Sequence, residues 1–411
     1  MKPFIQLFSL LIAFIVTIPV FGYNESDLVK FKALNACQGC DLSEANFDGE
    51  YLHGANLLLA DLSRAKLSGA TLSTANLSRV DLSGANLKDA KLRYTNLSGA
   101  ALENTFLTDV DLSGANLIGA TLEGAYLSAA NLSNANLSNA NLSGVDLRGS
   151  NFRGAILTGV NLSGANLNNA KLSNVNLDGV SLIKADLRGA NLTGVDLRTT
   201  NLYQANLYQA NLSGVDLRGS NFRGANLGEV NFSGANLNDV ALIKADLRGA
   251  NLTGVDLRTT NLYQANLYQA NLSGVDLRGS NFRGANLGEV NFSGADLRGS
   301  NFGKADLRGA NLTGVDLSGA NFIGADLNNA NLTGANLNNT KLRFANLSGV
   351  NLTGVDFSSA NLYEANLSGA NLTGVDLSSA NLNRVNLTGA DLRRAKYCKT
   401  RMTWGEVNDD C

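Results

Sequence analysis

The amino-acid sequence predicts an all-β solenoid, in which the chain winds into square coils that stack on one another. Every fifth residue from Leu42 to Leu392 is Leu or Phe, which makes 71 five-residue units without a break in register. A small residue, usually Ala or Val, stands two positions before nearly all of these central residues. A period of five fits neither a helix nor a half-buried strand, so the chain has to turn once in every unit.

Within a unit, the two apolar positions are expected to point inward and the Asn or Asp between them outward, as in a very short strand. The position two residues after the central residue is often Gly and sometimes Asn. Both residue types tolerate a positive φ, so this position is the predicted corner. Successive coils would then bond through their backbones at about 4.8 Å per layer.

The spacing of similar units indicates that four of them make one coil. Val-Asp-Leu or Val-Asp-Phe units from Val195 onward are all separated by a whole number of four-unit steps. Phe282, Phe302 and Phe322 share this spacing, so we expect their rings to stack in adjacent layers. Residues 182–235 and 242–295 are identical, but their offset of twelve units is compatible with coils of either three or four sides.

Residues 1–22 differ in composition from the rest and are typical of a secretory signal peptide. Lys2 precedes an apolar run, and the small residues Val20 and Gly22 stand before a possible cleavage site at Tyr23. We therefore expect the chain to be exported, either to the periplasm or to the medium. The alternative is an uncleaved signal anchor, because the apolar run is near the length that spans a bilayer.

The repeated units resemble those of the pentapeptide repeat protein family, and the resemblance covers residues 40–394. It implies a right-handed quadrilateral parallel β-helix. With about 71 units and four sides per coil, the rod would be about 85 Å long at the strand spacing. The Cys-rich entry and the Cys-bracketed tail are similar to those of exported members of the family.

A solenoid has to cover the apolar layer at each end, and the flanking segments are predicted to do so. Residues 23–39 form the expected N-terminal cap and residues 395–411 the C-terminal cap. A short helix is predicted over residues 24–35, with Asn24 or Ser26 as its N-cap. Its expected apolar face consists of Leu28, Phe31 and Leu34, and the residues expected to plug the other end are Tyr397, Met402 and Trp404.

The disulfide candidates are the four cysteines, and all of them lie in or beside these end segments: Cys37, Cys40, Cys398 and Cys411. An even number in an exported chain suggests disulfides, of which three pairings are conceivable. Because the rod separates the two ends, only Cys37–Cys40 with Cys398–Cys411 fits one monomer. The alternative for the C-x-x-C pair is a redox dithiol or half of a metal site.

The four-sided coil predicts columns of charged and aromatic side chains on the surface. Arg258, Arg278 and Arg298 would form one column beside a column of Asp two residues earlier in each unit. A self-neutralising ladder is favoured over a stripe for an anionic partner, because each Arg has its own Asp. A possible contact patch comprises these arginines and the outward aromatic residues Tyr203, Tyr208, Tyr263 and Tyr268.

Composition argues against several classes of function. Lys and Arg total 33 and Asp and Glu 35, so no basic surface for nucleic acid is expected. The chain has a single His, His53, which should point outward, and no nucleophile–base pair. The sequence therefore predicts a protein that is not an enzyme and has neither a cofactor nor a metal site.

The favoured interpretation is a non-enzymatic, exported structural or protein-interaction scaffold of bacterial origin, with an unidentified protein or envelope partner. The resemblance also implies an alternative, a DNA-mimicking protein that binds DNA gyrase and protects it from quinolones. A bare Asp column would suit that role, whereas here Arg offsets it. The other alternative is a flat-faced binder of ice or polysaccharide, suggested by a Thr column at Thr313, Thr333, Thr353 and Thr373.

Membrane contact is expected only with an uncleaved signal, and the oligomeric state is left open.

Overall fold

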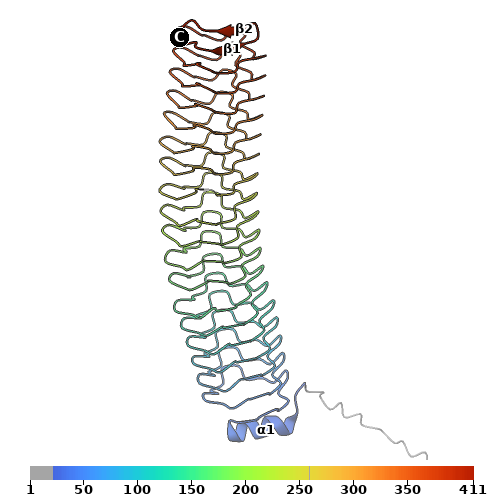
Figure 1. Cartoon of the computed structure of the whole chain (residues 1–411). Helices are drawn as coiled ribbons and strands as arrows, with labels where there is room; N and C mark the ends of the chain where they lie inside the picture. Colours follow the sequence, from blue (N-terminus) through green and yellow to red (C-terminus); the bar gives the residue numbers. More distant parts are fainter. Residues whose placement is uncertain (1–21, 259) are drawn as a thin grey trace, which may run out of the picture.

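The chain forms a single long, slightly curved rod of stacked coils (Figure 1). The computed structural model describes residues 22–258 and 260–411, so the expected signal segment lies outside the described residues apart from Gly22. The helix α1, Glu25–Leu34, lies across one end. The strands β1, Thr400–Met402, and β2, Gly405–Val407, lie at the other end beside the C-terminus. Among the described residues, no helix is long and apolar enough to cross a bilayer.

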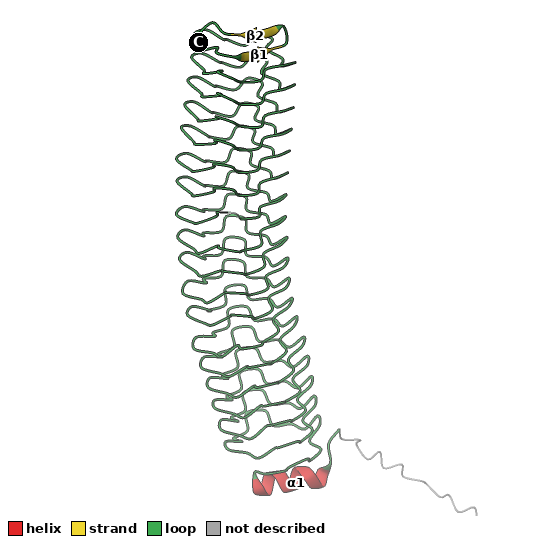
Figure 2. Ribbon diagram, viewed as in Figure 1, coloured by secondary structure: helices red, strands yellow, loops and turns green. Residues whose placement is uncertain are grey.

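Each coil consists of four five-residue units and has four sides, as the sequence predicts. Parallel backbone bridges join residue i to residue i+20, from Ala36 and Asn56 up to Asn381 and Arg401. On each side only one residue pairs in this way, which is why Figure 2 draws the rod as loop although it is a parallel β-helix. Leu317 N–H donates to the Asn336 carbonyl at 2.8 Å, and Asn336 N–H donates to the Val315 carbonyl at 3.0 Å.

The corners are β-turns with a residue of positive φ. Ala320 N–H donates to the Leu317 carbonyl at 3.0 Å, and between them Gly319 has a φ of 70°. This is the arrangement of a type II turn, whose third residue requires positive φ. Lys304 and Phe344 adopt φ values of 58° and 62° at equivalent corners. Residues other than Gly have a conformational penalty at these corners. The backbone hydrogen bonds to the layers above and below offset it.

The central Leu and Phe residues fill a continuous core along the rod axis. The rings of Phe282 and Phe302 stack with centroids 5.1 Å apart, and those of Phe302 and Phe322 with centroids 4.7 Å apart. The predicted stacking of these rings is therefore confirmed. Polar residues that replace the small inward residue are satisfied by backbone, as where Ser300 Oγ donates to the Leu277 carbonyl at 2.8 Å.

At the N-terminal end, α1 covers the first coils. The side chain of Asn24 caps the helix by accepting from the N–H of Ser26 at 2.9 Å. Phe31 is buried and packs edge-on against Phe47 with ring centroids 5.5 Å apart. Leu34 does not share this face, because it is 66% exposed at the last residue of the helix, where Asn35 turns the chain with a φ of 49°.

At the C-terminal end, the rod closes with an antiparallel hairpin of β1 and β2. Met402 is buried and Tyr397 is partly buried against the core, as expected of a plug. The expectation for Trp404 is wrong, since its side chain is 73% exposed. Trp404 lies in the turn between β1 and β2.

Both ends carry a disulfide. Cys37 is bonded to Cys40 in the first coil, and Cys398 is bonded to Cys411 beside the hairpin. The sulfurs of the C-x-x-C pair are buried and bonded to each other, which leaves no thiolate to act as a metal ligand. The second bridge fastens the last residue of the chain to the end of the rod.

The phenylalanine column predicts a large difference between inward and outward rings. We expect Phe302→Ala to lower the free energy of unfolding by about 3–5 kcal/mol, because it leaves a cavity between two stacked rings. Phe344→Ala is the matched control, since that ring is 49% exposed, and it should cost about 1 kcal/mol or less. Guanidinium chloride unfolding followed by circular dichroism measures both, and equal losses would contradict the inward column.

Candidate functional site

The four sides of the rod carry different residues, so each is a separate candidate surface. We name them by what they display between residues 182 and 375. In chain order, they are the arginine face with Arg298, the first tyrosine face with Tyr263, the second tyrosine face with Tyr268, and the flat face with Thr313. Each step of one unit moves a side chain by a quarter turn, and each step of four units moves it by one layer.

The arginine face is a ladder of ion pairs. Arg258, Arg278 and Arg298 each bind the Asp two residues earlier, with Nη2–Oδ2 distances of 2.6, 2.7 and 2.5 Å. Their Nε atoms also lie 3.7–3.8 Å from the Asp of the next layer. Positive and negative charges therefore alternate along this face. The arrangement keeps like charges tolerable and leaves no bare row of carboxylates in these layers.

The hydrogen bonds of the ladder change the acidity of its members. The guanidinium of Arg298 holds the pKa of the Asp296 carboxyl below its ordinary value of 3.8, although partial burial acts in the opposite direction. The pKa of Asp256 and of Asp276 is lowered in the same way by Arg258 and Arg278. The same contacts raise the pKa of each Arg, so the pairs stay ionised over the whole physiological range.

The contact patch suggested by the sequence is divided among three faces. The arginines lie on the arginine face, Tyr203 and Tyr263 lie on the first tyrosine face, and Tyr208 and Tyr268 lie on the second. The second tyrosine face is opposite the arginine face across the square coil. The structure therefore places the members of each Tyr pair on one face, three layers apart, but does not gather the seven residues into one surface.

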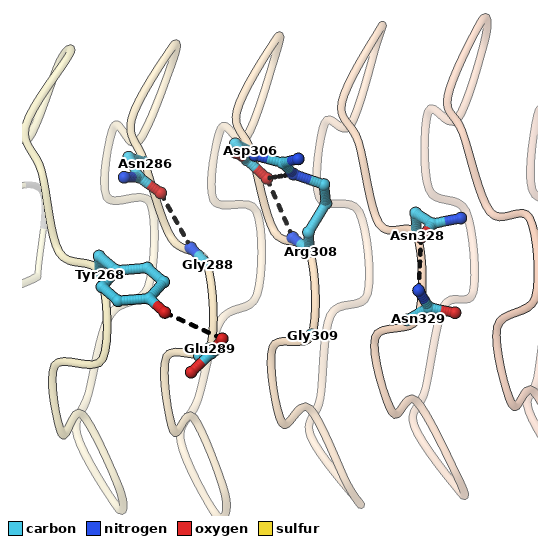
Figure 3. A pocket seen from close by; sticks show the side chains of 9 residues that line it. All are labelled: Tyr268, Asn286, Gly288, Glu289, Asp306, Arg308, Gly309, Asn328 and Asn329. Atoms are coloured by element: carbon cyan, nitrogen blue, oxygen red, sulfur yellow. Dashed lines mark hydrogen bonds and ion pairs between the residues drawn. The ribbon is translucent and has the colours of Figure 1, made fainter.

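The second tyrosine face contains a feature that sequence reasoning missed. Outward positions after the central Leu are usually Ser, Thr, Asn or Arg, but Gly228 and Gly288 stand there in two Leu-Gly-Glu-Val units. The ring of Tyr268 lies against Gly288, and its hydroxyl donates to Glu289 Oε1 at 2.9 Å (Figure 3). The same contact recurs one duplication earlier, where the Tyr208 hydroxyl donates to Glu229 at 2.7 Å. The missing side chains leave two hollows on this face, of about 540 and 370 Å³.

The flat face is uniform over ten layers. Ten successive units on this side, from 191 to 375, read Asn, then Leu or Phe, then Ser or Thr, then Gly, then Ala or Val. Thr313 Oγ1 donates to Asn311 Oδ1 at 2.7 Å, and Asn311 Nδ2 donates to Asn291 in the next layer at 3.2 Å. The outward side chains are short and uncharged, and these hydrogen bonds orient them. The Gly that follows the Ser or Thr in each of these units indicates the uniform face in the sequence, whereas the Thr column alone does not.

His53 lies near the N-terminal end, on the side of the coil that carries the flat face further along the rod. Its side chain is exposed, as expected, and its ring stacks on Tyr51 with centroids 5.8 Å apart. Its Nε2 is 3.4 Å from the Thr74 hydroxyl. These contacts are those of an exposed side chain that packs on its neighbours.

The ladder makes a prediction about acidity. Arg298→Gln should raise the pKa of Asp296 toward 3.8, because the carboxylate loses its strongest donor. The folded-state pKa is depressed, so the pair stabilises the fold above the ordinary pKa, and this small contribution is lost as pH falls through the folded-state value. Carboxyl carbon NMR titration measures the shift, with Asp256 as the internal control. An unchanged Asp296 pKa would contradict the ladder.

Comparison with known proteins gives the same repeat. A family model described as pentapeptide repeats (8 copies) matches most of the chain, over residues 37–73, 72–109, 95–134, 107–144, 125–164, 161–198, 200–239, 242–279, 276–314, 316–354 and 360–396. A comparison with curated proteins finds no match.

Three solved structures illustrate the likeness. HetL of Nostoc sp. strain PCC 7120, a pentapeptide repeat protein involved in heterocyst differentiation regulation, is 31% identical over 57% of this chain and 92% of its own, with a TM-score of 0.35. A pentapeptide repeat protein of the Arabidopsis thaliana thylakoid lumen is 36% identical over 24% and 68%, with a TM-score of 0.24. QnrB1, a plasmid-mediated fluoroquinolone resistance protein, is 22% identical over 54% and 90%, with a TM-score of 0.20. On the extent of the family match and the repeat geometry, the chain belongs to the pentapeptide repeat family.

Proposed function

We propose that the protein is a non-enzymatic, exported scaffold that binds other proteins or envelope components along the faces of its rod. The observation that carries the proposal is the ladder of backbone bridges that runs from Ala36 to Arg401. It makes a rigid support on which residues one coil apart along the chain lie in register on the same face. Repeat proteins of this kind use extended surfaces rather than enclosed sites for binding.

Export is proposed on two further observations. Residues 1–22 have the charge and apolar pattern of a signal peptide. The disulfides Cys37–Cys40 and Cys398–Cys411 are compatible with an oxidising compartment and rare in a reducing one. Periplasm or medium is therefore the proposed location, and anchoring by an uncleaved signal is the alternative.

We propose the scaffold rather than a DNA-mimicking gyrase ligand because the negative charges of the arginine face are neutralised. A mimic of duplex DNA needs rows of negative charge that a DNA-binding protein can read. On the arginine face, each of Asp256, Asp276 and Asp296 is paired with Arg at 2.7 Å or less. The net formal charge of the whole chain is only −2.

The flat face supports a second candidate function, binding to ice or to a crystalline polysaccharide. A flat crystalline ligand presents the same groups at regular intervals. A rigid protein surface that also repeats its side chains at regular intervals can therefore match it. Ten uniform layers at about 4.8 Å extend over roughly 45 Å. Thr313 and Thr333 hold their hydroxyls toward Asn311 and Asn331 at 2.7 Å, so little side-chain entropy would be lost on docking.

Export is tested by expressing the full chain in a bacterial host and fractionating the cells. We expect the protein outside the cytoplasm with Tyr23 as its first residue, as N-terminal sequencing would show. Leu11→Asp is the control, because a charge in the apolar run should retain the protein in the cytoplasm. Chemical cross-linking of the exported rod should then trap a partner. Cytoplasmic wild-type protein, or a rod with no trapped neighbour, would contradict the exported scaffold.

The second candidate is tested by Thr313→Lys, Thr333→Lys and Thr353→Lys combined in one variant. Long charged side chains should abolish the flatness, and hence both thermal hysteresis and co-sedimentation with cellulose or chitin. The control combines Ser318→Lys with Ser358→Lys, because these serines occupy the equivalent positions on the arginine face. Absence of both activities in the wild type, or their survival in the flat-face variant, would remove this candidate.

A further inference from the structure

The second tyrosine face carries the same three-residue sequence twice along the rod. Its outward column reads Tyr208, Gly228 and Arg248 in successive layers, and then Tyr268, Gly288 and Arg308. Each Gly removes a side chain between an aromatic ring and a guanidinium. The two hollows therefore follow from the column itself, and the larger one is drawn in Figure 3.

The tyrosine at each hollow is held in place before any ligand arrives. Glu289 accepts from the Tyr268 hydroxyl at 2.9 Å and from Gln269 Nε2 at 2.8 Å. A Cβ atom at Gly288 would come within 3.1 Å of the Tyr268 ring, so Gly gives the ring room to lie along the rod here. At the first hollow, a Cβ atom at Gly228 would likewise come within 3.0 Å of the Tyr208 ring. The result is a fixed aromatic platform, half-buried on one side.

The remaining lining is polar and planar. Arg308 folds back on Asp306 with an Nε–Oδ1 distance of 2.9 Å and an Nη2–Oδ2 distance of 2.7 Å. The side chain of Arg308 is nevertheless 64% exposed, so N–H groups remain for a ligand. On the far side, Asn329 Nδ2 donates to Asn328 Oδ1 at 2.6 Å, as Figure 3 shows. A carboxylate has about four lone-pair sites, and Glu289 uses two of them within the protein.

The charges of the larger hollow narrow the choice of ligand. Asp306 neutralises Arg308, and Glu289 adds a negative charge, so an anionic ligand would be repelled. A compact divalent cation needs several oxygen ligands, whereas Glu289 is the one carboxylate without an Arg partner among the described residues that line this hollow. A peptide strand would find no free backbone edge, because the coils on both sides of this hollow are already bridged. What remains is a neutral ring with many hydroxyl groups.

We propose that the two hollows at Tyr208–Gly228 and Tyr268–Gly288 are binding sites for units of a neutral oligosaccharide. The C–H face of a sugar ring would pack on the tyrosine, because aromatic rings offer a large apolar area with little entropy loss. Adjacent hydroxyls would bond to the planar carboxylate, amide and guanidinium groups, which can each make paired hydrogen bonds. This role is separate from the scaffold proposal and from the flat face, which is a different side of the coil.

The duplication gives the two sites a defined geometry. They lie on the same side of the rod, three layers apart, which is about 14 Å at the strand spacing. A linear oligosaccharide running along the rod would reach both. Two weak sites joined by one ligand bind more tightly than either alone, provided that the ligand spans the distance.

The test uses the full folded chain and three neutral probes: cellohexaose, chitohexaose and maltohexaose. Each probe is titrated up to about 10 mM, the weak end of specific binding. Binding is followed by calorimetry and by saturation-transfer NMR. We expect at least one probe to bind saturably and its ring protons to receive saturation from tyrosine. Tyr208→Ala with Tyr268→Ala should weaken binding at least about tenfold, because both platforms are lost. Gly228→Ser with Gly288→Ser should also weaken binding at least about tenfold, although both tyrosines remain. The new side chains would occupy the space in which the tyrosine rings now lie.

The matched control is Tyr203→Ala with Tyr263→Ala on the first tyrosine face, which should change affinity by less than about twofold. The Lys variant of the flat face should also bind normally, which separates this proposal from flat-face binding. Unfolding midpoints equal to that of the wild type establish that the variants are folded. No saturable binding of any probe, or an equal loss in the Tyr203/Tyr263 control, would overturn the proposal.

Discussion

The whole structure depends on one residue of positive φ at the corner that follows each short side. This residue turns the chain so that four sides close a coil and the next coil begins directly above the first. Gly319 meets the requirement without strain, whereas Lys304 and Phe344 meet it at a conformational cost. The backbone bonds of each side hold such corners in place from the layers above and below. Core, columns and faces all follow from this closure.

Each layer lies in register on the one beneath it, so side chains at the same position in successive coils form columns, or rows along the rod. A charged row would repel itself, and the arginine face avoids this by alternating Arg298 with Asp296 and Asp316 at 2.5 and 3.8 Å. The flat face avoids charge altogether over ten layers. On the second tyrosine face, by contrast, the row changes from layer to layer, and the absent side chains of Gly228 and Gly288 create concave surface. A rod gains local binding geometry mainly where its own repeat is broken.

Much of the fold could be predicted from the sequence, because periodicity determines which side of the coil a residue occupies. The four-sided coil, the stacked rings of Phe282, Phe302 and Phe322, and the positive φ at corners all follow from spacing and residue type. The ends were less predictable, since they lie outside the repeat. Trp404 is exposed because a hairpin turn places it there, which the apolar character of a single residue does not reveal. The hollows were missed because they depend on how Tyr268 lies over Gly288, and this is a matter of packing between layers rather than of position in the unit.

The identical blocks 182–235 and 242–295 are offset by three whole coils. Copying or deleting such a block lengthens or shortens the rod by whole coils. Each face beyond the change therefore stays on the same side of the rod. An insertion of a single unit would instead rotate everything beyond it by a quarter turn and break each row. The gene can thus vary the reach of this protein, and the number of its tyrosine hollows, in steps of one block without redesigning either end.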